Sequence, residues 1–213
     1  MSILLAGGTG QALLDQAANA HNIITIGRRP TKRAAQEIVA DFTNLPPLPP
    51  AKTAICALGT TIGKAGSQEA FQEVDYRAVV AFTQAARTAG TWHFLVVTTV
   101  GADPSSAVFY SRVKGEVERD LQSLGFDRLD IMQPGLLRGP RSETRPVESL
   151  PAVIAPLTDL AMQGPWRRYR SVHVSAVSRS LLRACEHTAP GVFIHQFDDI
   201  RRLACKGESM RTD

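Results

Sequence analysis

The chain has 213 residues, a length typical of one globular domain with a substantial core. Hydrophobic residues make up 44% and charged residues 21%, which excludes a disordered chain, and no apolar run approaches the ~18 residues of a membrane span. The net charge of +4 comes from scattered Lys and Arg, so we expect no nucleic-acid partner and no membrane contact. Binding of an anionic small molecule would explain the positive net charge as well as a nucleic-acid partner would.

Cysteine usage and the N-terminus point to an intracellular protein. Cys56, Cys185 and Cys205 are odd in number and widely spaced, without the pairing typical of metal ligands. We therefore expect reduced thiols, no bound metal and a cytoplasmic location. Residues 1–8 lack a basic segment and reach glycine after a few apolar residues, which predicts a strand rather than a signal peptide.

Apolar β-rich segments alternate with helical patterns along the chain. In chain order the predicted elements are a strand at 3–6, a helix to about 20, a strand at 23–26, a short helix at 32–37, a strand ending at Asp41, a strand at 53–58, a helix at 68–88, a strand at 94–98, a helix from 110 to 124, a strand at 128–132, an extended piece at 171–174, a helix at 176–187 and a strand at 192–197.

This alternation predicts an α/β fold, a doubly wound parallel sheet with helices on both sides. We expect a single domain over residues 1–213, in which residues 134–175 lose the regular pattern and form a small substrate-side region. Ligands bind such sheets at the carboxyl ends of the strands.

The first such strand end carries Gly7-Gly8-Thr9-Gly10, directly before a predicted helix. Glycines let backbone N–H groups approach a pyrophosphate, and the N-terminus of a helix favours anions. The sequence therefore predicts dinucleotide binding here. A plain strand-to-helix turn is the alternative.

The second strand ends in Arg28 and Arg29. An NAD-selective site would carry Asp or Glu at this position, whereas guanidinium groups can pair with a 2′-phosphate. We therefore expect NADP(H) as the cofactor in preference to NAD(H). The alternative is a solvated basic turn.

Tyr110 and Lys114 lie four residues apart at the start of a predicted helix, so both side chains share one face. A free tyrosine loses its proton only near pH ~10, and a nearby cation stabilises the phenolate that acid–base catalysis requires. Lys114 can supply that cation. The same spacing also occurs by chance on many helices.

Thr98 and Thr99 end the fifth strand. A hydroxyl at this place could hydrogen-bond a substrate carbonyl beside Tyr110. The alternative is a strand end that is merely rich in β-branched residues.

These motifs together resemble the atypical short-chain dehydrogenase/reductases, most closely the group of the Tat-interacting oxidoreductase-like proteins and bacterial relatives labelled nucleoside-diphosphate-sugar epimerases. The matching segments are Gly7 to Gly10, Ala57 to Thr61, Gly63 to Gly66, Phe71 to Tyr76, Thr98 to Asp103, Tyr110 to Glu116 and Gln133 to Gly135. The resemblance covers nearly the whole chain.

The resemblance implies a Rossmann fold, NADP(H) binding and a catalytic group in which Tyr110 exchanges a proton with the substrate. Lys114 would hold the nicotinamide ribose and support the phenolate, and Thr99, with Thr98 as the next candidate, would stand for the family's Ser or Thr. The other residues implied at the cofactor are Asp41, Phe42, Leu58, Gly59, Thr60 and Pro134.

The chain departs from this family pattern in two places. Leu13 occupies the position of the third fingerprint glycine, as though about three residues were absent after Gly10. If the chain is continuous there, the shortened helix would misplace the N–H groups that bind the pyrophosphate. The alternative is that a segment is missing from the sequence. Asp75 stands where many relatives have Asn, which changes the surroundings of the proton-relay water.

Three functions remain open. The first is an NADP(H)-dependent oxidoreductase, which moves hydride to or from a small carbonyl or alcohol substrate with Tyr110 as acid and base. The second is a regulatory protein that senses NADP(H) without turnover, and the third is a nucleotide-sugar epimerase or dehydratase. The sequence fixes neither the substrate nor the oligomeric state, a homodimer included.

Overall fold

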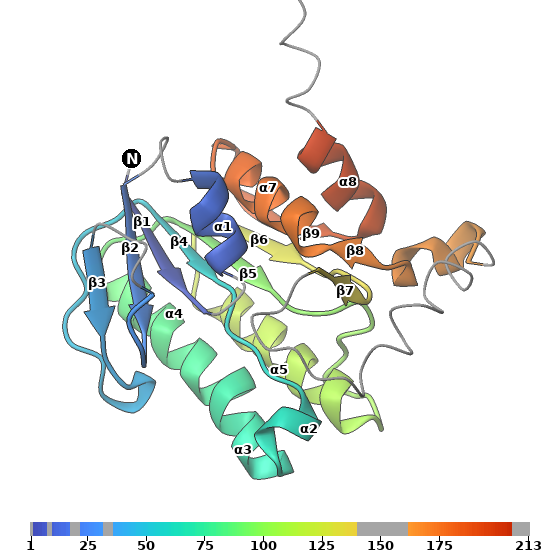
Figure 1. Cartoon of the computed structure of the whole chain (residues 1–213), viewed down its shortest axis with the longest axis horizontal. Coiled ribbons are helices and arrows are strands. Elements are labelled where there is room, and N and C mark those ends of the chain that lie inside the picture. Colours follow the sequence, from blue (N-terminus) through green and yellow to red (C-terminus); the bar gives the residue numbers. More distant parts are fainter. Residues whose placement is uncertain (1, 8–9, 18–21, 32–35, 140–161, 206–213) are drawn as a thin grey trace, which may run out of the picture.

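The structure is a computed structural model that describes residues 2–7, 10–17, 22–31, 36–139 and 162–205. Its centre is a sheet of seven parallel strands (Figure 1). In spatial order the strands are β3 (Gln36–Val39), β2 (Asn22–Gly27), β1 (Ser2–Ala6), β4 (Thr53–Cys56), β5 (His93–Val97), β6 (Arg128–Met132) and β9 (Gly191–His195). This order confirms the predicted doubly wound α/β fold, because the chain runs outward from β1 in both directions.

Helices cover both faces of the sheet, as Figure 1 shows. One layer contains α1 (Gly10–Ala17), α7 (Val174–Ala184) and α8 (Phe197–Cys205), which bury Leu13 and Leu181 in one apolar core. The other layer contains α3 (Gln68–Gln72), α4 (Ala78–Thr88) and α5 (Phe109–Ser123), whose Phe82 and Leu121 pack in a second core. Alternate residues of each central strand face the two cores, so β5 is buried on both faces.

The third strand differs from the prediction. It spans Gln36–Val39 and pairs with β2, so Glu37 belongs to the strand rather than to the end of a helix. The strand stops before Asp41 because the Asp41 carboxylate accepts a hydrogen bond from the backbone N–H of Thr43 and caps η1, a short 3-10 helix (Phe42–Asn44). The rest of the predicted helix, residues 32–35, lies outside the described residues.

The predicted helix at 68–88 is confirmed, with one internal irregularity. A π-helical turn, η2 (Glu73–Arg77), separates α3 from α4. Such turns insert one extra residue and often occur at functional sites. Here the turn contains Asp75, whose side chain is completely buried.

The end of the chain was predicted only in part. Strand β9 ends at His195, and the segment after it forms α8, which the prediction missed. Phe197, Ile200 and Leu203 of α8 are buried at a spacing of three residues, the helical signal that was overlooked.

Between β6 and α7 the chain forms a second, two-stranded sheet. Strand β7 (Leu137–Arg138) pairs with β8 (Val172–His173), which follows the 3-10 helix η4 (Gly164–Tyr169). These elements fall in the predicted substrate-side region. Its bounds stay a prediction, because residues 140–161 lie outside the described residues.

Three further expectations concern the chain as a whole. Helix α1 begins at Gly10 and runs through Gln11 to Ala17. Within the described residues, no helix has both the length and the apolar character needed to cross a membrane. The same part of the chain holds no cluster of three metal-ligating side chains.

Candidate functional site at the carboxyl edge of the sheet

The loop after β1 requires glycine at its first position. Gly7 has φ +115°, and a Cβ atom there would lie 2.2 Å from the carbonyl carbon of Ala57. The Ala57 N–H donates to the Ala6 carbonyl at 2.7 Å, which draws the loops after β1 and β4 together. Gly7 therefore shapes the turn before α1. The predicted cofactor residues Gly8 and Thr9 lie outside the described residues, and nothing is described of the surroundings of Gly10.

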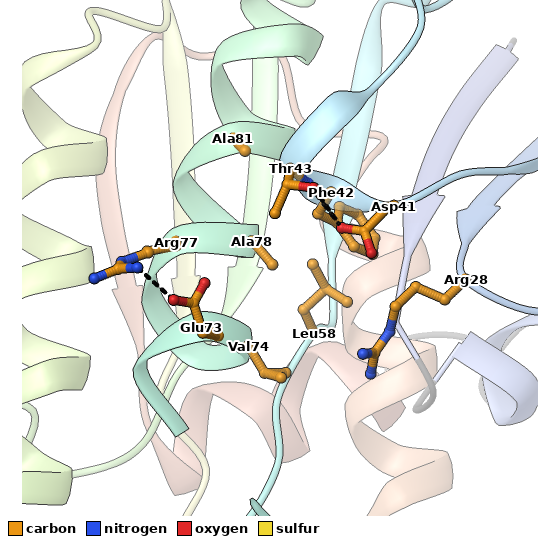
Figure 2. A pocket seen from close by; sticks show the side chains of 10 residues that line it. All are labelled: Arg28, Asp41, Phe42, Thr43, Leu58, Glu73, Val74, Arg77, Ala78 and Ala81. Atoms are coloured by element: carbon orange, nitrogen blue, oxygen red, sulfur yellow. Dashed lines mark hydrogen bonds and ion pairs between the residues drawn. The ribbon is translucent and has the colours of Figure 1, made fainter. Parts of the chain in front are cut away.

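A pocket of about 520 Å³ lies between the ends of β2, β3 and β4 and the helical segment of η2 and α4 (Figure 2). It is lined by Arg28, Asp41, Phe42, Thr43, Leu58, Glu73, Val74, Arg77, Ala78 and Ala81. Four predicted cofactor residues, from three separate loops, thus meet in one cavity. Its volume suits one end of a cofactor-sized ligand.

The charges at this pocket lie on opposite sides. Hydrogen bonds from Thr43 lower the pKa of Asp41, and the nearby Arg28 guanidinium lowers it further. Across the cavity, Glu73 and Arg77 form an ion pair on η2 (Figure 2). Both Arg28 and Arg29 are exposed, but only Arg28 is among the residues that line the pocket. Of the two arginines predicted to bind a 2′-phosphate, Arg28 is the one that lines this pocket.

The predicted catalytic lysine is held by the residue that departs from the family pattern. Lys114 Nζ lies 2.7 Å from Asp75 Oδ1, and both side chains are buried. The other carboxylate oxygen of Asp75 accepts the Thr60 N–H at 2.8 Å. Burial raises the pKa of Asp75, while Lys114 and Thr60 oppose that rise. The acid therefore anchors both the ammonium and the loop after β4.

Gly59 forms the surface above this ion pair. A Cβ atom at Gly59 would lie 3.4 Å from Asp75 Oδ1 and 3.7 Å from Lys114 Nζ. Gly59 itself is exposed. Because the outward side of Gly59 lies this close to the ammonium, a ligand lying on Gly59 would come close to Lys114.

Tyr110 remains available for chemistry. It begins α5 one turn before Lys114, is half-buried, and packs its ring 5.5 Å from that of Phe71. Its hydroxyl makes no hydrogen bond to another described residue. The ring is thus fixed by packing, which leaves the hydroxyl to a ligand.

The two threonines that follow β5 have different surroundings. Thr98 is buried, and its hydroxyl donates to Glu118 Oε1 at 2.5 Å. Gln133 donates to the same carboxylate at 3.0 and 2.9 Å. Thr99 is only half-buried, and its hydroxyl is bonded to no other described residue. The Thr98 hydroxyl is therefore occupied by its bond to Glu118. Thr99 is the better candidate for substrate contact.

Glu118 is the buried residue that the sequence prediction missed. Burial raises the pKa of Glu118. The hydrogen bonds from Thr98 and Gln133 and the nearby charge of Lys114 lower it, but they do not cancel the effect of burial. The signal was present, because Tyr110, Lys114 and Glu118 follow one another at intervals of four residues on α5.

The loops after β5 and β6 are joined by a backbone hydrogen bond. Pro134 is buried directly after β6, and its carbonyl accepts the Val100 N–H at 3.0 Å. This bond fixes the loop after Thr99 to the loop after β6. Pro134 thus shapes the site through its backbone.

Comparison with known proteins decides the family. The family model described as HIM1 matches residues 20–160, about two thirds of the chain. The chain belongs to the HIM1 family. The match includes the strands and helices that carry the pocket, Asp75, Tyr110 and Lys114.

Relatives of this HIM1-family chain include fungal and mammalian proteins. It is 32% identical to "Protein fmp52, mitochondrial" of Aspergillus fumigatus over 214 aligned positions, which cover 89% of this chain and 90% of the relative. It is 37% identical to "Protein HTATIP2" of Rattus norvegicus, over 70% of this chain and 67% of that protein. The match to the fmp52 protein of Aspergillus niger, at 37% identity, spans 60% of each. These relatives confirm the predicted resemblance.

Solved structures share the fold of this HIM1-family chain at low sequence identity. MoeE5 in complex with UDP-glucuronic acid and NAD superposes with a TM-score of 0.69 at 16% identity, covering 98% of this chain and 83% of that one. The UDP-glucose 4-epimerase of Thermus thermophilus in complex with NAD gives 0.65 at 14%, over 96% and 81%. At such identities the likeness shows the Rossmann-like fold alone.

Proposed function

We propose that the protein is an NADP(H)-dependent oxidoreductase of the atypical short-chain dehydrogenase/reductase type. The observation that carries the proposal is the buried Lys114–Asp75 pair, which lies one helical turn from Tyr110 and directly beneath Gly59. Acid–base catalysis by tyrosine needs a cation near the phenol, and the Tyr110 hydroxyl makes no hydrogen bond to another described residue. The pocket of Arg28 and Asp41 lies at the same sheet edge and is lined by Leu58, the residue before Gly59.

The residues present fit a dinucleotide along this edge. Gly7 leaves the backbone bare where a pyrophosphate would lie, and the Arg28 pocket has room for an adenosine part with a charged partner for a 2′-phosphate. The dinucleotide supplies the hydride. This arrangement favours NADP(H), and the fold neighbours in complex with NAD support the wider class.

In the proposed reaction, residues of the chain have separate roles. Lys114, held by Asp75, keeps two further N–H groups for ribose hydroxyls, and its charge stabilises the Tyr110 phenolate. Tyr110 gives a proton to the substrate oxygen during reduction and takes it back during oxidation. The Thr99 hydroxyl orients the substrate carbonyl beside it.

The proposal is tested by NADPH oxidation with a panel of aldehydes, ketones and quinones. Tyr110→Phe should reduce kcat by about 100-fold or more, since general acid catalysis contributes ~10²–10⁴. Tyr76→Phe is the matched control, because the Tyr76 hydroxyl bonds Asp120 on the outer side of α5. Equal activity of Tyr110→Phe and wild type would contradict the proposed acid.

A nucleotide-sugar epimerase is the second candidate, favoured by the shared fold with UDP-sugar enzymes. Titration with UDP-glucose separates the two, because the oxidoreductase should not bind it tightly. NADPH binding without turnover of any compound would instead favour the sensor. The cytoplasmic location stays a prediction, as the Aspergillus fumigatus relative is named mitochondrial.

A further inference from the structure

Three arginines follow one another closely in and after η4, and two of them are tied to the protein. Arg167 pairs with Asp198 of α8 at 2.7 Å. Arg170 donates to the Met162 carbonyl at 2.7 Å and lies over the ring of Phe197. Both side chains therefore fasten η4 to its surroundings.

Arg168 is arranged differently. Its guanidinium lies 5.0 Å from the centre of the Tyr169 ring and donates to the Tyr169 hydroxyl at 3.2 Å. Among the described residues no carboxylate pairs with it, and it is exposed. The positive charge thus rests on an aromatic ring rather than on an acid, and it remains open to an anion.

Tyr169 places this charge at the substrate side of the site. A Cβ atom at Gly101 would lie 3.8 Å from the Tyr169 hydroxyl, and Gly101 is only two residues beyond Thr99. A Cβ atom at Gly135 would lie 2.4 Å from the Arg170 carbonyl oxygen. The end of η4 therefore packs against both loops that flank the site, after β5 and after β6.

A second aromatic ring extends this surface. Trp166 is 65% exposed, although Trp is among the more buried residue types, and its ring lies 5.9 Å from that of Tyr169. Two rings and a guanidinium that pairs with no carboxylate among the described residues are suited to a flat ligand with a negative group.

We propose that Arg168 and Tyr169 are specificity-determining residues that select aromatic carbonyl substrates bearing a carboxylate. The inference rests on the proposed function in that it treats the ligand as a substrate, whereas binding of the ligand can be tested separately. Arg168 binds the carboxylate, and the rings of Tyr169 and Trp166 contact the aromatic part.

Binding is measured first, without any dinucleotide. In a Trp92→Phe background Trp166 is the only remaining tryptophan, so its fluorescence reports on η4. 4-(Hydroxymethyl)benzoate should bind at least tenfold tighter than benzyl alcohol, since a hydrogen bond to a charged group contributes about 1.5–3 kcal/mol. Arg168→Leu should reduce this preference to within about twofold.

Arg167→Leu is the matched control, because it removes a neighbouring charge that is already paired with Asp198. It should keep the preference for the carboxylate. An absent preference in the wild type, or the same preference in Arg168→Leu, would overturn the inference.

Turnover separates this inference from the proposed function. NADPH oxidation with 4-carboxybenzaldehyde should exceed that with benzaldehyde in kcat/KM by about tenfold, and Arg168→Leu should remove the difference. Equal kcat/KM values for both aldehydes in both proteins would overturn the inference and leave the oxidoreductase intact. Arg168-dependent binding without any turnover would support the ligand site and contradict the oxidoreductase.

Discussion

The Lys114–Asp75 pair is the residue-scale feature on which catalysis depends most. Both charges are buried, so removing one partner leaves the other uncompensated. Lys114→Met should lower the free energy of unfolding by about 3–5 kcal/mol. The double variant Asp75→Asn/Lys114→Met should recover most of that loss in urea unfolding. Additive losses from the two changes would show that the pair is not coupled.

At the residue scale, the sequence predicts local geometry where spacing alone carries the information. Tyr110 and Lys114 share a helix face, and Gly7 and Arg28 end strands that meet at one edge. The pairing of Asp75 with Lys114 joins two elements 39 residues apart in sequence, which no local pattern reveals. For the same reason Thr98 was taken for a catalytic candidate, because its bond to Glu118 is visible only in the folded chain.

At the scale of elements, the turn between β1 and α1 depends on Gly7. A Cβ atom would meet the Ala57 carbonyl at 2.2 Å, and φ +115° is strained for any other residue. Gly7→Ala should cost at least about 1–3 kcal/mol of stability and abolish NADPH binding. Gly63→Ala is the control, since its Cβ would have no neighbour within 4 Å. Thermal unfolding measures the stability of the two variants, and titration measures their affinity for NADPH. If Gly7→Ala had effects as small as those of Gly63→Ala, the account would be contradicted.

The buried central strands were predicted well. Buried parallel strands are continuous apolar runs, and β6 was predicted with its observed bounds, Arg128–Met132. The π-helical turn η2 and the cap at Asp41 depend on hydrogen bonds and on Asp75 being drawn inward, which propensity does not encode. Helix α8 was missed because its apolar positions follow the last strand without a turn signal.

At the scale of the whole molecule, a buried polar cluster joins three strands. Asp130 of β6 accepts hydrogen bonds from His93 at 2.7 Å and His195 at 2.6 Å, and pairs with Arg128 at 2.6 Å. The three partners come from β5, β9 and β6 itself. The cluster fixes the edge strand β9 to the sheet, a role for the histidines that sequence spacing did not indicate.

This cluster should make stability depend on acid. Burial alone would raise the pKa of Asp130, but the hydrogen bonds from His195, His93 and Arg128 outweigh it and lower the pKa. A lowered pKa means that the stabilisation is complete above the unfolded value near ~4 and is lost as the pH falls below it. Asp130→Asn should cost about 3–5 kcal/mol at pH 7 and clearly less at pH 3 in urea unfolding.

The matched control for this prediction is Asp127→Asn, an exposed acid just before β6. It should change stability little at either pH. A cost of Asp130→Asn that does not shrink in acid would show that the carboxylate charge is not what holds the cluster.

The central claim is that a phosphorylated dinucleotide occupies the edge between Gly7 and Tyr110, and calorimetric titration with NADPH and NADH tests it most directly. Wild type should bind NADPH about 10–100-fold tighter than NADH, since a charge-assisted bond to the 2′-phosphate is worth about 1.5–3 kcal/mol. Arg28→Ala should remove that advantage and leave NADH binding nearly unchanged, while Arg29→Ala, outside the pocket, should keep it. Equal weakening of both dinucleotides by Arg28→Ala, or no binding of either by the wild type, would contradict the account.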